Sequence, residues 1–228
     1  MAQEHAIPKW LSKAGKRNDN DYYQRVRNDK TIRTKLIEIK TRRICEDCNT
    51  GWLSRIELSA KAAVEPLLGN ERRIGEADRW VIARWFTKTV LTTQLAIMPR
   101  TQQGPITTDT YQQFYDNPKP PNSLILFMSA YAGPVQPIRY IAVLSERDDH
   151  LRVLFHFQHI VFYGLFVIGD STALYVPGGF LDATYVIWPT TRGFLNNDDP
   201  TISFKWPPKF SLGPDFIDKL IDTVVPEF

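Results

Sequence analysis

A series of short apolar runs between residues 123 and 188 places the strongest constraint on how this chain of 228 residues can fold. The runs are LILFM, RYIAVL, LRVLFHF, HIVFYGLFVI, ALYV and TYVIW, and Gly, Pro and Asp residues separate them. Runs of this length, rich in β-branched and aromatic residues and bounded by turn residues, predict the strands of an antiparallel sheet.

Three other stretches have apolar residues at helical spacing. Residues 53–68 form the first, a second helix capped by Asp78 runs to Met98, and the third covers residues 214–225. The alternating pattern of residues 31–44 predicts one or two short strands, whereas the polar residues 12–30 predict a loop. The predicted class is therefore α+β.

Charge divides the chain into two parts. Residues 1–75 contain 16 Lys and Arg against 10 Asp and Glu, whereas residues 76–228 contain 12 against 15. The charged stretch 69–75 is the best candidate for a boundary, so we expect a basic module over 1–75 and an α+β domain with the sheet over 76–228. A basic segment suits a polyanionic partner, although a solvated basic face is the more common explanation of a charge run.

Two short motifs in the basic module contain residues capable of chemistry. Glu4 and His5 stand together in EHAIPKWL, and Cys45-x-x-Cys48 is followed directly by Asn49. Each motif alone is weak evidence, because a Cys-x-x-Cys pair can be a redox site, a metal site or neither. A lone His near a chain end is also often an ordinary surface residue.

In their order along the chain, the segments EHAIPKWL and ICEDCNTGWLSRIE resemble the HNH-type nucleases. The likeness is to a bacterial group of HNH-like proteins with the pattern EHxxPxWL…CxxCNxGW and a β-rich domain after it. This resemblance implies a small N-terminal ββα-metal module. It further implies a metal-dependent endonuclease that hydrolyses phosphodiester bonds in DNA, with RNA as a second candidate.

The resemblance also assigns roles to individual residues. His5 would be the general base, Glu4 and Asn49 would hold a Mg²⁺ or similar divalent cation, and Cys45 and Cys48 would form one zinc knuckle. Chemistry supports these residue types, because a His titrates near neutral pH and a hard cation prefers oxygen ligands. The basic side chains of Arg42, Arg43 and Arg55 would position the nucleic-acid backbone.

Two departures from the family pattern bear on this site. The family's first Cys-x-x-Cys is missing, and the chain has two Cys in all, so it cannot form a Cys₄ zinc site by itself. The middle Asn of the HNH name is also not evident, and Lys40 stands about where it would fall. A non-catalytic nucleic-acid-binding module or a protein-interaction module with a degenerate HNH site is therefore the alternative to an enzyme.

No uncharged stretch predicts a membrane span. The run after Lys88 has eleven residues against the 18 or so that a span needs, prolines interrupt residues 120–138, and residues 153–169 contain two His and a Gln and are expected to form strands. The start of the chain lacks the apolar segment of a signal peptide, and two Cys do not form a disulfide framework. We therefore expect a cytoplasmic protein whose partner is nucleic acid rather than a membrane. His156 and His159 are expected to be ordinary strand residues on opposite faces.

Overall fold

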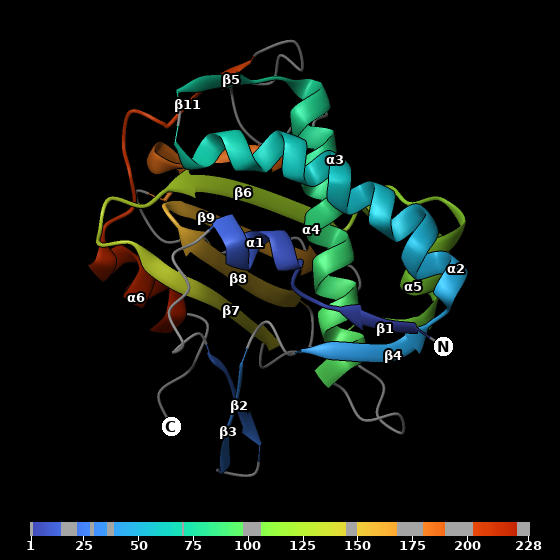
Figure 1. Cartoon of the computed structure of the whole chain (residues 1–228). Helices are drawn as coiled ribbons and strands as arrows, with labels where there is room; N and C mark the ends of the chain where they lie inside the picture. The colour runs from blue at the N-terminus through green and yellow to red at the C-terminus, as the bar shows by residue number, and fades with distance from the viewer. Residues whose placement is uncertain are drawn as a thin grey trace.

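Five antiparallel strands form the sheet that the apolar runs predict (Figure 1). Their order across the sheet is β10-β6-β9-β8-β7, and every neighbouring pair is antiparallel. These strands are β6 (Leu124–Ala130), β7 (Gln136–Leu144), β8 (His150–Gln158), β9 (Ile160–Val167) and β10 (Tyr185–Trp188). Helices accompany the sheet, so the α+β class is confirmed.

This computed structural model describes residues 2–14, 22–27, 30–35, 39–69, 71–97, 106–144, 150–167, 180–189 and 203–222. The helices are α1 (Lys9–Ala14), α2 (Glu46–Cys48), η2 (Asn49–Leu53), α3 (Ser54–Val64), η3 (Glu65–Leu68), α4 (Glu76–Ile97), α5 (Thr108–Asp116), η4 (Leu181–Ala183) and α6 (Pro214–Asp222). The short strands outside the large sheet are β1 (Ala2–His5), β2 (Tyr22–Arg27), β3 (Lys30–Lys35), β4 (Lys40–Ile44), β5 (Arg72–Ile74) and β11 (Phe204–Trp206). The predicted ALYV strand and the last residues of the predicted C-terminal helix lie outside the described residues.

Both faces of the central sheet are covered, which explains why its strands are continuous apolar runs. Along β6, Leu124, Leu126 and Met128 belong to the core cluster that includes α4, whereas Ile125 and Phe127 belong to a second cluster. That second cluster contains residues of α6 on the other face. The period of two along a strand therefore sends alternate side chains into two cores.

Helix α4 is buried along most of its length and crosses one face of the sheet (Figure 1). Its apolar residues Trp85, Phe86 and Val90 are all fully buried. Asp78 lies in the first turn rather than at the cap, and its carboxylate accepts a hydrogen bond from the Gly75 backbone N–H at 3.2 Å. This is the return bond of a capping box, which satisfies a backbone donor before the helix begins.

Helix α4 approaches the sheet closely at Gly164 of β9. A Cβ atom at Gly164 would lie 2.4 Å from Cε1 and 2.7 Å from Cζ of the Phe86 ring. Glycine therefore lets the helix lie against the strand with the ring between them.

The N-terminal third forms two antiparallel strand pairs. Strand β1 pairs with β4, and β2 pairs with β3. The expectation of one or two short strands in residues 31–44 is confirmed by β3 and β4. The loop expected over residues 12–30 is wrong, because α1 extends to Ala14 and β2 occupies Tyr22–Arg27. The strand-favouring residues of YYQRVR are scattered among charges, and pairing with β3 decides their conformation.

The stretch 69–75, predicted as a linker, contains strand β5, which pairs with β11 from the far end of the chain. The indole N–H of Trp206 donates a hydrogen bond to the Leu67 carbonyl at 2.9 Å. One core cluster contains residues from both sides of position 75, from Ile7 and Val64 to Phe86. The division into 1–75 and 76–228 stays a prediction, and the two parts share this core.

Within the described residues, no helix combines the length and the apolar character needed to cross a membrane.

Candidate functional site

The strand pair β1–β4 fixes where the predicted acid and base lie. Glu4 is opposite Thr41, and His5 is opposite Lys40. Successive side chains of a strand point to opposite faces. Glu4 is accordingly buried, with 8% of its surface exposed, whereas His5 is half-buried beside exposed Lys40.

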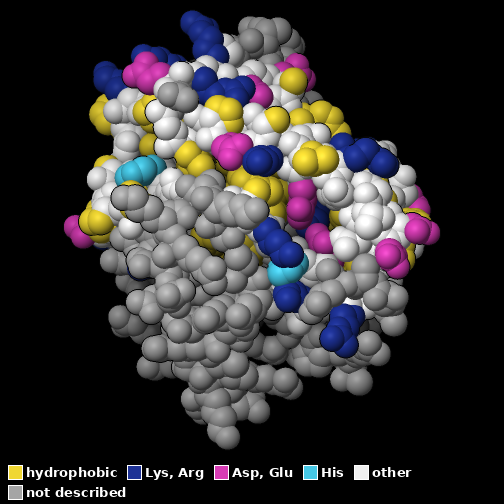
Figure 2. Space-filling model, viewed as in Figure 1, with side chains coloured by type: hydrophobic (Ala, Val, Ile, Leu, Met, Phe, Trp, Pro, Cys, Tyr) yellow, Lys and Arg dark blue, Asp and Glu magenta, His cyan; other side chains and the backbone are white. Residues whose placement is uncertain are grey.

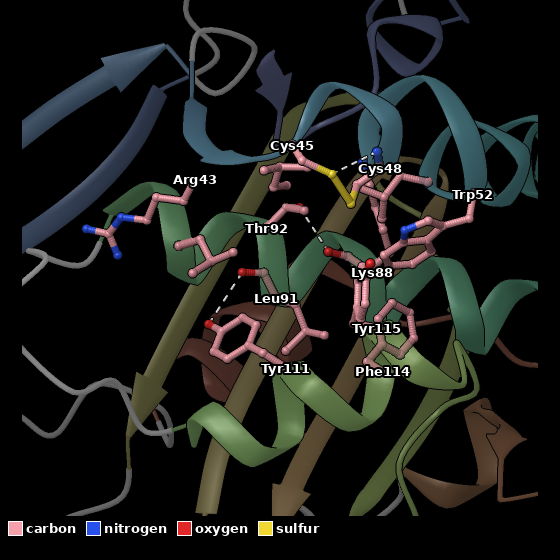
Figure 3. A pocket seen from close by; sticks show the side chains of 13 residues that line it. Arg43, Cys45, Cys48, Trp52, Lys88, Leu91, Thr92, Tyr111, Phe114 and Tyr115 are labelled. Carbon is pink, nitrogen blue, oxygen red and sulfur yellow. Dashed lines mark hydrogen bonds between the residues drawn. A yellow bond between two sulfur atoms is a disulfide. The ribbon is translucent and has the colours of Figure 1, made fainter. Parts of the chain in front are cut away.

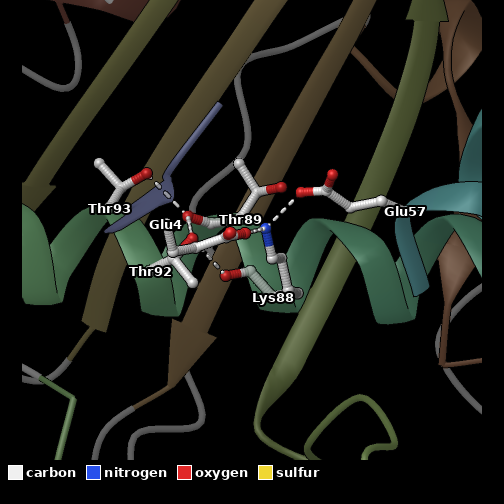
Figure 4. Close-up of polar contacts among 6 residues, drawn as sticks. All are labelled: Glu4, Glu57, Lys88, Thr89, Thr92 and Thr93. Atoms are coloured by element: carbon white, nitrogen blue, oxygen red, sulfur yellow. Dashed lines mark hydrogen bonds and ion pairs between the residues drawn. The ribbon is translucent and has the colours of Figure 1, made fainter. Parts of the chain in front are cut away.

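Glu4 contacts a lysine that the sequence motifs do not include. The ammonium of Lys88, in the middle of α4, donates hydrogen bonds to the carboxylates of Glu4 and of Glu57 in α3 (Figure 4). The Lys88 Nζ to Glu57 Oε1 distance is 2.5 Å. Lys88 is fully buried, so it is neutralised inside the protein by carboxylates from two other elements.

Burial changes the pKa of Glu4 in this cluster. The pKa of Glu4 is raised above its ordinary value because burial disfavours the carboxylate, and Lys88 opposes this effect. Two carboxylates around one ammonium also repel each other, and Glu57 raises the pKa of Glu4 for this reason. The cluster therefore holds a proton at Glu4 more readily than an exposed glutamate would.

The buried part of α4 around Lys88 also contains several threonines whose hydroxyl groups bond within the helix. The hydroxyl group of Thr87 donates to the Ala83 carbonyl at 2.9 Å. Those of Thr92 and Thr93 donate to carbonyls in the preceding turn, at 2.9 and 2.7 Å (Figure 4). Their polar atoms are thus satisfied within the helix. The helix is buried on more faces than the predicted apolar stripe alone would cover.

The two cysteines are joined in a disulfide at the start of the helical segment (Figure 3). Cys45 is exposed and precedes α2, and its Sγ accepts a hydrogen bond from the Cys48 backbone N–H at 3.0 Å. Zinc binds thiolates, so the predicted half-knuckle requires this disulfide to be reduced first. With the disulfide formed, Cys45 and Cys48 are bonded to each other and cannot bind zinc.

Asn49, the predicted second metal ligand, begins η2 directly after Cys48. Its backbone N–H donates to the Cys45 carbonyl at 3.0 Å, and its side chain is half-buried. The residue of this helical segment that joins Glu4 at Lys88 is Glu57. Eight positions separate Asn49 from Glu57, and non-helical backbone at Gly51 kinks the segment between them.

The three predicted backbone-binding arginines lie near the strand pair and the helix. Arg42 on β4 and Arg55 on α3 are exposed, whereas Arg43 is half-buried. Arg55 lies close enough to Arg84 of α4 to lower the pKa of that guanidinium, in addition to the larger effect of burial. Figure 2 shows Lys and Arg side chains on both sides of a His side chain near the middle of this face.

The residues present do not fit the divalent cation that the resemblance implies. Glu4 is already bound to Lys88, and a cation beside Lys88 would be repelled by a buried like charge. The parts of the chain that the structure describes contain no group of three or more His, Cys, Asp and Glu able to hold a metal ion. No catalytic step through a metal follows from this geometry.

Of the two histidines of the H-x-x-H sequence, His156 is a strand residue as predicted, whereas His159 lies outside the strand. His156 is a fully buried residue of β8 whose ring lies edge-on to Tyr131, with 4.6 Å between ring centroids. Burial lowers the pKa of His156 to about 4. His159 is exposed in the turn after β8, because the strand ends at Gln158 with a positive φ of 52°.

Sequence analysis missed Lys88 and Glu57. A signal for Lys88 existed, since it is the single charged residue between Trp85 and Met98. A lone lysine in a stretch predicted to be buried requires a counter-ion, and buried lysines are rare unless paired. Glu57 had no comparable signal, because it looks like an ordinary surface residue of an amphipathic helix.

In comparisons with models of protein families, with curated protein sequences and with solved structures, nothing matched this chain.

Proposed function

We propose that this chain binds nucleic acid through its basic N-terminal third, on an HNH-like layout in which a lysine takes the place of the metal ion. The proposal that this layout lacks a catalytic metal ion rests on the ion pair of Lys88 with Glu4 and Glu57. Glu4, the residue that the resemblance assigns to the metal, already has a permanent cation.

The energetics favour keeping this internal cation. A divalent ion at Glu4 would have to displace an ammonium group that has no exposed surface. Lys88 would then remain buried without its counter-charges, and breaking a buried pair costs about 3–5 kcal/mol. The cluster is therefore better suited to holding β1, α3 and α4 together than to exchanging metals.

Charge supports nucleic acid as the partner. The excess of Lys and Arg falls in residues 1–75, and Lys40, Arg42 and Arg55 are exposed around the β1–β4 pair and α3. Contacts to phosphates release counterions, so a cluster of this kind gives sequence-independent affinity. Base-specific recognition is not part of this proposal.

A metal-dependent nuclease is the second candidate, and one observation favours it. Strands β1 and β4 are followed by α3, which is the order of the ββα module, and His5 is half-buried next to Glu4 at the end of β1. In this candidate His5 would deprotonate a water molecule. The Lys88 ion pair counts against it.

One pair of assays separates these candidates. Fluorescence anisotropy of a labelled DNA duplex is measured between 50 and 200 mM salt, with wild type, Arg42→Ala and Arg55→Ala. Binding should weaken steeply with salt, and each variant should reduce the log–log salt slope by about one if that arginine contacts a phosphate. The matched control is Lys119→Ala, which removes an exposed basic side chain outside residues 1–75.

Plasmid nicking with Mg²⁺ or Mn²⁺ forms the second assay, comparing wild type with His5→Ala. Salt-dependent binding with no nicking by either protein supports the proposal. Nicking that requires His5 would establish the nuclease instead. Absence of affinity for both DNA and RNA would overturn both candidates and leave a protein-interaction module.

A further inference from the structure

A cavity of about 370 Å³ lies between β4, α2, η2, α4 and α5 (Figure 3). Its lining includes Arg43, Trp52, Leu95, Tyr111, Phe114 and Tyr115. Cavities that bind small ligands have volumes of about 300–1,000 Å³. This cavity is large enough for one ring system with a few substituents.

Aromatic rings form one end of the cavity. Trp52 lies edge-on to Phe114 and to Tyr115, with centroid distances of 5.7 and 6.1 Å, and Figure 3 shows the three grouped together. Tyr115 is 54% exposed, so this end reaches the surface. Burial raises the pKa of Tyr111 to about 12, so its phenol is neutral at physiological pH. A flat, uncharged ring fits walls of this kind.

Trp52 also has an unused hydrogen-bond donor. Its indole Nε1 is buried and has no hydrogen-bond partner among the described residues. Leaving a buried donor unpaired is unfavourable, and buried indole groups usually have an acceptor. A ligand with a carbonyl oxygen or ring nitrogen at this end would supply one.

The other end of the cavity is basic. Figure 3 places Arg43 at the opposite side from Trp52, and Arg42 precedes it on the exposed side of β4. The ammonium of Lys88 faces Glu4 and Glu57, so it is already neutralised. A ring attached to a phosphate would therefore place the ring beside Trp52 and the phosphate near Arg43, the arginine of β4 that lines the cavity.

We propose that this cavity binds a planar heteroaromatic ring with a hydrogen-bond acceptor, and that the ring is an unstacked base of a bound single-stranded DNA segment. The inference rests on the proposed function for the identity of the strand. Sequence-tolerant stacking on aromatic side chains is a common way for proteins to bind single strands. A free nucleotide has the same ring chemistry, and the experiment distinguishes the two sources.

The test measures the affinity of a labelled DNA strand of twelve thymidines against an abasic strand of the same length and charge, at one salt concentration. Wild type should bind the base-containing strand about tenfold more tightly, because stacking adds to the phosphate contacts. Trp52→Phe keeps a ring but removes the N–H donor, and it should reduce this preference about fivefold. Trp80→Phe is the matched control, since Trp80 is 36% exposed and stacks on Trp188, outside the cavity lining.

A second variant guards against a folding defect in Trp52→Phe. Leu95→Trp enlarges a half-buried side chain that lines the cavity, and it should remove the preference for the base-containing strand while leaving the affinity for the abasic strand unchanged. Equal affinity of wild type for both strands would overturn the inference and leave the proposed function standing. If thymidine monophosphate quenches the tryptophan fluorescence but the protein binds neither strand, the ligand is a free nucleotide. That result would overturn both the assignment of the ring to a DNA strand and the proposed function.

Discussion

Lys88 of α4 donates a hydrogen bond to Glu4 of β1, 84 positions earlier in the chain. The same ammonium binds Glu57 of α3, so one fully buried side chain connects three elements. A buried ion pair is weak evidence for net stability, but removing one partner leaves the other charge in a medium that solvates it poorly.

Replacing Lys88 by methionine should lower the free energy of unfolding by about 3–5 kcal/mol, because Glu4 then remains buried without its partner. Urea denaturation measures the change. Lys61→Met is the matched control, since Lys61 pairs with Glu65 on the surface and should cost less than about 1 kcal/mol. The double variant Glu4→Gln with Lys88→Met should recover part of the loss, and equal costs for Lys88→Met and Lys61→Met would show that the buried cluster is not formed.

His156 should make the protein less stable in acid. Its pKa is about 4 in the folded protein, against about 6.5 in an unfolded chain, because burial disfavours the charged ring. As the pH falls from about 6.5 to about 4, the unfolded state takes up the proton first, so up to about 3 kcal/mol of stability is lost. Above about pH 6.5 the ring is neutral in both the folded and the unfolded state, so His156 causes no loss of stability there.

Denaturation at a series of pH values tests this prediction. His156→Phe should have a smaller loss of stability between pH 6.5 and 4 than wild type, whereas His159→Gln, at the exposed turn, should keep it. Carboxylates titrate in the same pH range and affect the stability of every variant. The contribution of His156 is therefore taken from the difference between His156→Phe and wild type. Identical pH profiles for His156→Phe and wild type would contradict the prediction.

Gly164→Ala should destabilise the fold by about 1–3 kcal/mol, as overpacking of a core does. The added methyl group would lie 2.4 Å from the Phe86 ring, between α4 and the centre of the sheet. Gly69→Ala is the matched control, because a Cβ atom there meets nothing within 4 Å. A shift in the urea midpoint for Gly164→Ala that is no larger than that for Gly69→Ala would show that the helix can move away from β9.

Reducing the Cys45–Cys48 disulfide should have a small effect on stability. The loop it closes is short, so the bond removes little entropy from the unfolded chain, about 2 kcal/mol in the chain-entropy model. Mass spectrometry after alkylation, with and without a dithiol, counts the thiols, and unfolding of both forms gives the energy. The reduced protein should not retain one zinc ion per chain through dialysis, because the chain has two Cys where a closed site needs four ligands.

Much of the fold was predictable from local patterns. The strands β6, β8 and β9 are apolar runs bounded by turn residues, and α4 carries a helical stripe that ends near the predicted residue. The errors fall where contacts between distant segments decide the conformation. Strand β2 depends on β3, and β5 depends on β11 from residues 204–206, so neither local pattern contained enough information.

The candidate site was predictable only in part. The motif placed Glu4 and His5 together, and the strand period explains why one is buried and the other half-buried. Which cation Glu4 meets depends on how α4 packs, and no spacing near residue 4 contains that information. The aromatic end of the cavity likewise combines Trp52 with residues of α5, which are about sixty positions apart.

The pairing of β5 with β11 has a practical consequence for genetic studies of this chain. Substitutions near Trp206 would loosen a strand and a hydrogen bond that hold the segment between α3 and α4. Their effects would then reach the Lys88 cluster without touching any bound molecule. Variants that lose function in a random screen should therefore be sorted by their thermal stability before any of them is assigned to the proposed DNA-binding surface.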